Sequence, residues 1–506
     1  MSYRSGMQVR GSLTVFFALT MMTMISMVFS LLELIHYKAI LGQSRIAAEA
    51  AIDSAFADYN RLLWDEFGIL AIDSGYCSDS PSIALLESRM TSYAAVNASP
   101  EAKGANLYRM QCGSCTVSEY GLATDDEGLP ALKEAAIYAG SRVGVQVIDA
   151  LKESVSEAEK AESQQKTVED YLKEADDASK DAKELASGQI AADADGASET
   201  GVKLPEKPPK DPPDNPVETI VKLKDKSVLA QVMGSDMKIS EKKLLMDDPP
   251  SSRTLAGGNT SEPVSFGLSD RLLFADYAAT YLGYFGKPQD HPGLSYECEY
   301  LLCGRDSDEK NLEGMVERLL LSREAENMAS IVSDPAKMSS ALELATAILG
   351  WTLNEALVTA LQYGIAAAWA YLESVLDVRL LLSGGRVAMV KTPEQWTSRL
   401  EAFATYFPVE QKAIESESGL NYKDYMLIFL GLTFTKNLGL RFLDILENSL
   451  RSCEDYSQVR VDNLIFSMKV ECDFEARPLF FSLIPTADRD FSGYSFKLTQ
   501  GMSYIT

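Results

Sequence analysis

One uncharged stretch near the start of the chain, from Ser12 to Leu32, constrains the fold more than any other feature. An α-helix rises 1.5 Å per residue, so a helix over this stretch crosses the ~30 Å hydrocarbon core of a bilayer once. Arg4 and Arg10 precede it on a short tail. Because basic residues stay on the cytoplasmic side, we expect a cytoplasmic N-terminus and a large extracytoplasmic remainder.

A cleaved secretory signal is the main alternative for this stretch. Such signals have an apolar region of about 7–15 residues, followed by small residues at a cleavage site. Here the apolar region is longer, and Leu34, Ile35, His36 and Tyr37 follow it. Helical periodicity then continues in an apolar stripe that consists of Leu41, Ala48, Ile52, Phe56, Tyr59 and Leu63. The pattern therefore predicts a membrane helix that continues as an amphipathic stem.

The start of the apolar stretch carries a family resemblance. Arg10, Gly11 and Ser12, followed by LTVFFAL, resemble the start of tight-adherence (Tad) pilus proteins of the TadE and TadG type. Further blocks resemble an uncharacterised Gram-positive family of single-pass membrane proteins often associated with Tad-like pilus loci: Leu62 to Asp73, Glu297 to Asn327, Trp369 to Lys391 and Asn421 to Leu430. The resemblance implies a structural protein of the membrane, pilin-like or involved in pilus assembly, whose N-terminal helix meets other pilus subunits.

The resemblance also implies processing by a prepilin peptidase between Gly11 and Ser12. Many pilins carry a glutamate at the fifth residue after this cut, where it pairs with the freed N-terminus of a neighbouring subunit. This chain has Phe16 there. Glu33 does not replace that glutamate, because it lies about one membrane thickness further along the helix. An uncleaved anchor is therefore an alternative to processing.

Composition narrows the classes of fold and function. The 506 residues are 46% hydrophobic, enough for a core of one to three domains, and we expect two lobes. The formal net charge is -26, which excludes nucleic acid as an expected partner because phosphate binding needs a basic face. The acidic excess is typical of a soluble surface.

The cysteines allow several arrangements. Outside the membrane thiols can pair, but the chain has an odd number of them, and sequence alone does not give the connectivity. The candidates for disulfides are Cys112, Cys115, Cys298, Cys303, Cys453 and Cys472, and the seventh cysteine is Cys77. Cys112-Gly-Ser-Cys115 is also compatible with a redox or zinc site, but no second CxxC accompanies it and the chain has only two histidines. Two buried apolar cysteines, or one local disulfide, is the favoured interpretation.

Hydrophobic periodicity predicts an α+β fold dominated by helices, with a long N-terminal transmembrane and stem helix, an antiparallel sheet packed by helices, and a projecting helical arm. The expected segments are a cytoplasmic leader (1–11), a transmembrane helix (12–35), the stem and the N-terminal part of a head (36–145), a charged helical arm (146–187), a proline-rich linker or arm tip (188–216), a helix and loop (217–263) and a C-terminal α+β lobe (264–506). The arm has only a thin stripe of small residues, among them Leu172, Ala175 and Ala182, to bury against its own continuation or a partner. A solvated helix with no partner is the alternative.

Alternation of polar and apolar residues predicts the strands. The strongest signal runs from Phe466 to Phe474, and weaker ones lie near Leu107 to Tyr120, at Leu294 to Leu302 and at Tyr494 to Leu498. We expect them to form one antiparallel sheet that helices cover on one face. Long helices are expected at Ser82 to Ala95, Leu268 to Phe285, Lys310 to Val332, Pro335 to Leu349, Leu353 to Leu382 and Tyr422 to Leu450. The uncharged run Ala356 to Leu372 is expected to be a buried core helix, with a second membrane span as the alternative.

No motif indicates catalysis, a cofactor or a metal. The sequence has no G-x-S-x-G elbow, phosphate loop, dinucleotide fingerprint or H-E-x-x-H helix. Asp306, Asp308 and Glu309 resemble a calcium loop only weakly, and acidic residues at a helix start explain them better. We therefore expect no enzyme, no cofactor and no metal site. The alternative is an anchored extracytoplasmic enzyme such as a cell-wall hydrolase, whereas a sensor is disfavoured because the cytoplasmic tail leaves no room for a signalling domain.

Overall fold

The computed structural model describes residues 8–98, 108–140, 152, 165–195, 213–234, 237–260, 262–289, 291, 293–433, 435–480 and 493–505. These residues form two compact units, each assembled from separate parts of the chain. The stem unit comprises Met1–Glu134, Asp248–Ser265 and Leu450–Thr506, and the helical unit comprises Ala135–Asp247 and Phe266–Ser449. The end of the chain thus returns to the stem unit, whereas the sequence predicted one continuous lobe over 264–506.

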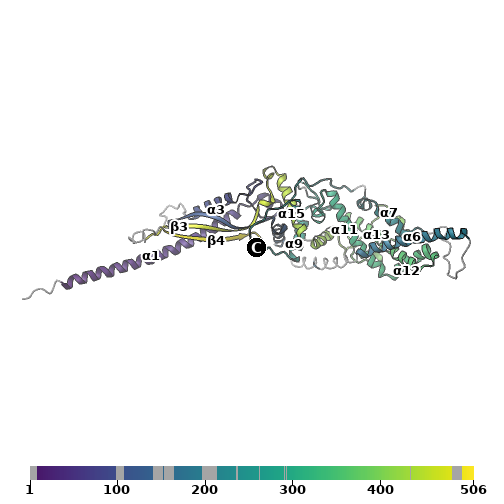
Figure 1. Ribbon diagram of the computed structural model, residues 1–506, viewed down its shortest axis with the longest axis horizontal. Helices are drawn as coiled ribbons and strands as arrows, with labels where there is room; N and C mark the ends of the chain where they lie inside the picture. Colours follow the sequence, from purple (N-terminus) through teal and green to yellow (C-terminus); the bar gives the residue numbers. More distant parts are fainter. Residues whose placement is uncertain are drawn as a thin grey trace, which may run out of the picture. The chain divides into compact units, whose positions relative to one another are not determined.

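The stem unit is built on one long helix, α1 (Gln8–Phe56), which joins the apolar stretch to the predicted stem without a break (Figure 1). The shorter helices α2 (Arg61–Phe67) and α3 (Ile83–Ala98) follow, and α4 (Leu129–Gly140) begins in this unit and continues in the helical unit from Ala135. Asn60 begins α2 by accepting a hydrogen bond from the backbone N–H of Leu63 at 3.1 Å. Gly68 ends α2 in the left-handed conformation that glycine adopts at least cost.

One antiparallel sheet completes the stem unit. Its central strand is β3 (Leu464–Ala476), which pairs with β2 (Met110–Leu122) and β4 (Tyr494–Ser503) along its length and with the short β1 (Ile72–Asp73) at its start. The predicted alternation in β3 is confirmed, because its apolar side chains are buried while the intervening side chains are partly or fully exposed. Helices α1 and α3 cover the apolar face. The core between them includes Ile40, Ala47, Ala51, Ile52, Phe56, Met90, Met468, Val470 and Phe474.

The helical unit surrounds one central helix, α13 (Glu355–Leu382), whose residues are all buried from Gly364 to Leu382. The other helices of this unit are α6 (Gln165–Asp195), α7 (Pro216–Lys224), α8 (Val228–Val232), α9 (Leu268–Tyr281), α10 (Glu297–Cys303), α11 (Asp308–Val332), α12 (Pro335–Leu349), α14 (Tyr422–Leu432) and most of α15 (Thr435–Ser452). Helices α6, α7, α11 and α12 pack directly on α13 (Figure 1). The fold as a whole is α+β and dominated by helices, as predicted.

The predicted arm corresponds in part to α6. Leu172, Ala175 and Ala182 are buried, so the thin stripe packs within the same chain, on α13. Gly364 of α13 allows the two helices to approach closely, because a Cβ atom added there would lie 2.0 Å from the Cβ of Ala175. The far end of α6 extends past the helices on which it packs (Figure 1). Most of 146–164 and all of 196–212, with four of the prolines in the predicted linker, lie outside the described residues.

Two predicted elements were wrong. The alternation from Leu294 to Leu302 is not a strand, because α10 begins at Glu297 and buries polar and apolar side chains alike. The predicted helix from Tyr422 to Leu450 is two helices, since α14 ends at Leu432 and Thr433 takes an extended conformation. The hydroxyl group of Thr433 donates to the backbone oxygen of Phe429 at 2.8 Å. Such a local hydrogen bond competes with helix continuation.

Candidate functional site

The predicted processing site lies inside α1. Gly11 and Ser12 both fall within the helical range Gln8–Phe56, so the bond between them is part of a continuous helix. Whether this bond is cut stays a prediction.

The cysteines form one disulfide among the described residues, and it is not a local one. Cys115 of β2 and Cys472 of β3 face each other in the sheet register and are bonded. Cys112 is a free thiol whose Sγ atom lies 3.9 Å from that of Cys115, and burial raises its pKa. Cys77, Cys298, Cys303 and Cys453 are also free. The local pairing within the CxxC motif is therefore not formed. Sequence could not show the actual partner of Cys115, which depends on the strand register.

The acidic cluster at the start of α11 is structural. Asp308 is fully buried and accepts hydrogen bonds from the backbone N–H groups of Ser295 and Tyr296 at 2.9 and 3.0 Å. Asp306 is exposed and pairs with Lys310 at 2.8 Å. In the described parts of the chain, no three histidine, cysteine, aspartate or glutamate side chains are grouped so that they could hold a metal ion.

A groove beside the sheet contains a basic side chain, and this side chain is paired with acidic neighbours. Lys469 of β3 lines it and forms ion pairs with Glu119 at 3.1 Å and Glu262 at 2.9 Å. This groove therefore presents no unpaired cation for an acidic ligand at Lys469.

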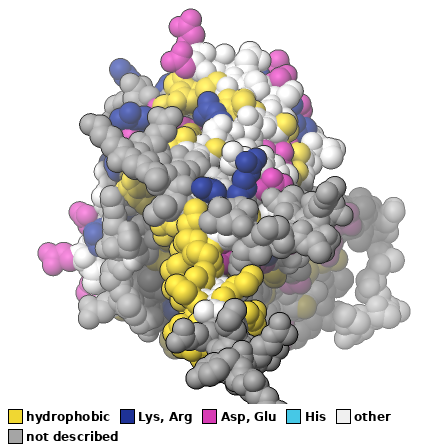
Figure 2. Space-filling view, turned by 90° about the vertical axis from the view of Figure 1, so that its left-hand side faces the viewer, with side chains coloured by type: hydrophobic (Ala, Val, Ile, Leu, Met, Phe, Trp, Pro, Cys, Tyr) yellow, Lys and Arg dark blue, Asp and Glu magenta, His cyan; other side chains and the backbone are white. Residues whose placement is uncertain are grey.

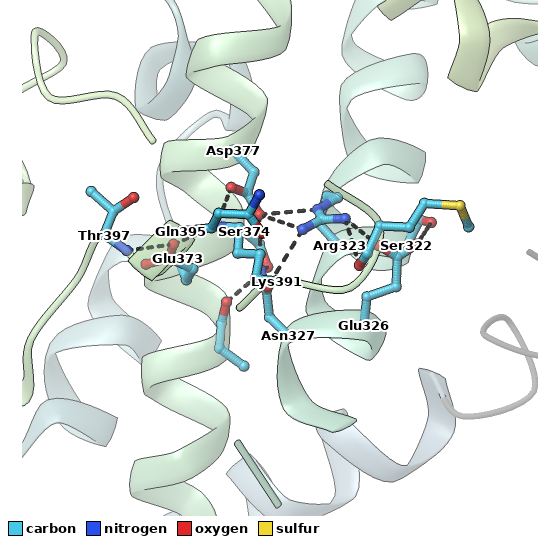
Figure 3. Close-up of polar contacts among 12 residues, drawn as sticks. Ser322, Arg323, Glu326, Asn327, Glu373, Ser374, Asp377, Lys391, Gln395 and Thr397 are labelled. Atoms are coloured by element: carbon cyan, nitrogen blue, oxygen red, sulfur yellow. Dashed lines mark hydrogen bonds and ion pairs between the residues drawn. The ribbon is translucent and has the colours of Figure 1, made fainter. Parts of the chain in front are cut away.

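The densest group of charges is a buried network in the helical unit (Figure 3). Asp377 of α13 lies between two cations, with its Oδ2 atom 2.9 Å from Nη2 of Arg323 and its Oδ1 atom 2.5 Å from Nζ of Lys391. Lys391 also pairs with Glu373, one helical turn before Asp377. Arg323 pairs with Glu326 and donates to the hydroxyl group of Tyr425 at 3.1 Å.

Neutral groups complete this network. Glu373 accepts hydrogen bonds from the backbone N–H groups of Thr397 at 3.0 Å and Ser398 at 2.8 Å. Asn327 donates to the hydroxyl oxygen of Ser374 and to Asp377, both at 3.0 Å. The network thus joins α11, α13, α14 and the loop after α13.

Burial determines what the network can do chemically. The side chains of Arg323, Asp377, Glu373 and Lys391 are at most 1% exposed, so no substrate reaches them. Burial alone would raise the pKa of Asp377, but Arg323 and Lys391 outweigh it and hold the pKa below its ordinary value. Burial raises the pKa of Glu326 to about 7, although Arg323 opposes the shift. Each of these charges is paired inside the protein, so the arrangement joins the helices that pack around it.

A second buried carboxylate joins α10 to α14. Glu299 is fully buried and accepts hydrogen bonds from the hydroxyl group of Tyr422 at 2.6 Å and the backbone N–H of Phe285 at 2.9 Å. Burial raises its pKa to about 7. Glu299, Arg323, Asp377 and Tyr422 come from three sequence blocks that carried the family resemblance. Those blocks meet in the interior of one unit, a relation that their separation along the chain concealed.

In the stem unit, the polar group of most interest is Glu33 of α1. Its exposed fraction is 1%, and its carboxylate accepts hydrogen bonds from the backbone N–H of Phe480 at 2.6 Å and of Leu479 at 3.3 Å. The hydroxyl group of Tyr494 donates to it at 2.8 Å. We call Glu33, Leu479, Phe480 and Tyr494 the stem junction. Sequence placed Glu33 at the outer membrane interface but did not reveal that both flanks of the β3–β4 connection bind it.

The part of α1 before the stem junction is apolar and open. Large side chains from Leu13 to Met27 are 45–72% exposed. Figure 2 looks at the end of the molecule from which α1 extends and shows hydrophobic side chains in a band along this helix. In the described part of the chain, α1 is the one unbroken helix that is long and apolar enough to cross a membrane, and α13 is not. Helices α14 and α15, which are bent by 116° relative to each other, pass the same test only when they are taken together.

Comparison with protein families gives one match. A model of a family of unknown function, DUF5702, matches residues 206–476, which is more than half of the chain. The chain belongs to the DUF5702 family. The DUF5702 region contains both buried networks and β3, whereas α1, β2 and β4 lie outside it. No curated protein and no solved structure matches the chain.

Proposed function

We propose that this DUF5702 protein is a membrane-anchored extracytoplasmic structural protein that acts as a minor pilin-like subunit or an assembly component of a Tad-like pilus. Helix α1 is its single membrane anchor and its contact with other pilus subunits. Both compact units lie outside the cell.

The main support for this proposal is that the two parts of α1 have different surroundings. Its first part has large apolar side chains with no protein cover, a costly arrangement in water that lipid or a neighbouring apolar helix relieves. Its second part buries Ile40, Ile52 and Phe56 under an antiparallel sheet. In a pilin-like protein, one end of such a helix is expected to anchor the chain in the membrane, and the other end is expected to form part of the core of the head.

Two further features support the extracytoplasmic placement and the structural role. The Cys115–Cys472 disulfide is of a kind that persists in oxidising compartments outside the cytoplasm. The most densely grouped charged side chains of the described residues, such as Asp377 and Lys391, are buried and paired with one another. Their chemistry is therefore structural.

The experiment is co-purification of the full chain with pilus subunits from detergent-solubilised membranes. We expect the subunits to co-purify, and we expect to lose them when Ser12–Leu32 is replaced by an unrelated apolar helix of equal length that still anchors the chain. N-terminal sequencing of the same material distinguishes the two forms of the proposal, because a start at Ser12 indicates a processed pilin-like subunit and a start at Met1 an assembly component. Normal surface fibres in a deletion strain, together with no co-purifying subunit, would contradict the proposal.

A further inference from the structure

We infer that the stem junction is a second contact with the bilayer, at which Leu479 and Phe480, just after β3, enter the lipid interface beside α1. This inference rests on the proposed membrane anchor and adds to it a surface and its ligand, the outer leaflet of the same membrane. The chain is then held by a spanning helix and by an inserted flank of the sheet.

Phe480 lies at the depth of the apolar part of α1. Its ring stacks on the ring of Phe29, with the centroids 5.8 Å apart and the planes 18° apart. Phe29 lies three residues before the end of the uncharged stretch at Leu32, which at 1.5 Å per residue is about 5 Å inside the apolar span. A ring stacked on Phe29 is at the same depth.

The polar backbone groups described at that depth have partners within the protein. Backbone N–H groups in hydrocarbon need a protein acceptor, because water is absent. Leu479 and Phe480 have one, since their N–H groups donate to Glu33. The same contacts satisfy the carboxylate, whose presence at the edge of a membrane span would otherwise be costly. In a head held clear of the membrane, water would satisfy these groups equally well.

Aromatic side chains lie around the stem junction. Tyr37, two helical turns above Phe29, packs edge-on against Tyr494, with ring centroids 5.2 Å apart. Tyrosine rings with a polar tip are enriched where membrane meets water, directly above the apolar region. The rings of Phe29 and Phe480 are only half-buried by protein, and lipid covers the remaining apolar surface.

The experiment measures depth in the full chain with tryptophan fluorescence. Phe480→Trp is compared with Phe17→Trp, in the first third of the apolar part of α1, and with Met502→Trp, at the opposite end of β4. Each protein is reconstituted alone into phosphatidylcholine vesicles, with or without bromine on the acyl chains. The parent protein supplies the background from its four tryptophans.

Quenching of the added fluorescence by brominated lipid is expected for Phe480→Trp and Phe17→Trp, with blue-shifted emission, and not for Met502→Trp. Quenching of Phe17→Trp without quenching of Phe480→Trp would overturn the further inference and leave the anchor intact. Quenching of neither would contradict the anchor itself. Leu479→Trp serves as a second probe of the same depth if Phe480→Trp does not fold, with the Cys115–Cys472 disulfide as the test of folding.

Discussion

Asp377 shows how single residues hold the helical unit together. It bonds to Arg323 and Lys391 in an interior from which water is excluded, so each cation compensates a carboxylate that would otherwise be buried alone. Removing one partner of such a pair costs more than the pair contributes, because the remaining charge keeps its desolvation penalty.

Lys391→Met is therefore expected to lower the free energy of unfolding by about 3–5 kcal/mol, because Glu373 and Asp377 lose their shared cation. Urea denaturation of the parent and the variant measures the difference. The matched control is Lys310→Met, in an exposed pair with Asp306, where the expected loss is below about 1 kcal/mol. Equal losses in the two variants would contradict the role given to the network.

Glu299 makes stability depend on pH. Its folded-state pKa is raised by burial to about 7, above its ordinary value of 4.5. Between these values the folded state holds a proton that the unfolded state has released, so this contribution to stability is complete below pH 4.5 and is lost as the pH rises through 7. The parent is expected to lose free energy of unfolding when the pH rises from 5 to 8. In Glu299→Gln this loss is expected to be smaller by roughly 1–3 kcal/mol, because the amide does not titrate.

Denaturation of both proteins at the two pH values tests this expectation. The other carboxylates are common to parent and variant, so their contributions cancel in the comparison. Glu309→Gln, an exposed change on α11, is the control and should keep the parental pH dependence. A parental pH dependence in Glu299→Gln would show that this carboxyl group titrates normally.

Glu33→Ala is expected to destabilise the stem unit by about 2–3 kcal/mol, because two backbone N–H groups and the hydroxyl group of Tyr494 lose a charged acceptor. Denaturation of the detergent-solubilised chain measures the loss. Glu49→Ala, an exposed change on the same helix, should leave stability almost unchanged. If Glu33→Ala behaves like Glu49→Ala, the carboxylate does not hold the sheet to α1.

The sequence patterns that predict strands and helices differed in quality for a physical reason. The strand β3 was predicted because one face of it meets a core and the other meets solvent, which produces a clean alternation. Helix α10 has no solvent face, since Glu297 and Glu299 are buried with their apolar neighbours. Periodicity reports contact with water, so it fails where buried polar groups are satisfied by the protein.

The β2–β3 pairing makes its own prediction. Mass spectrometry of unreduced peptides should recover Cys115 linked to Cys472, with Cys112 free. Replacing both linked cysteines by serine should lower stability by about 2–5 kcal/mol, because the bond joins distant segments of the chain. Cys77→Ser, at an exposed free thiol, is the control. A peptide in which Cys112 is linked to Cys115 would contradict the observed register.

At the scale of the whole molecule, the chain does not divide where its sequence suggests. The sequence predicted two lobes, with a continuous C-terminal one over 264–506, but the stem unit takes in Asp248–Ser265 and Leu450–Thr506 as well as the N-terminal part. Long-range strand pairing, such as β2 with β3, leaves no local signal from which to infer this. The buried networks were hidden for the same reason, because Arg323 and Asp377 gain meaning only when α11 lies on α13.

We propose that α1 fixes this DUF5702 protein to the membrane and leaves both units outside. Protease treatment of intact protoplasts, followed by detection of a tag at the N-terminus, tests it most directly. We expect the full-length chain to disappear while the tag stays on a short membrane-bound fragment that contains α1. A full-length chain that survives in intact protoplasts, yet is digested once they are lysed, would contradict it.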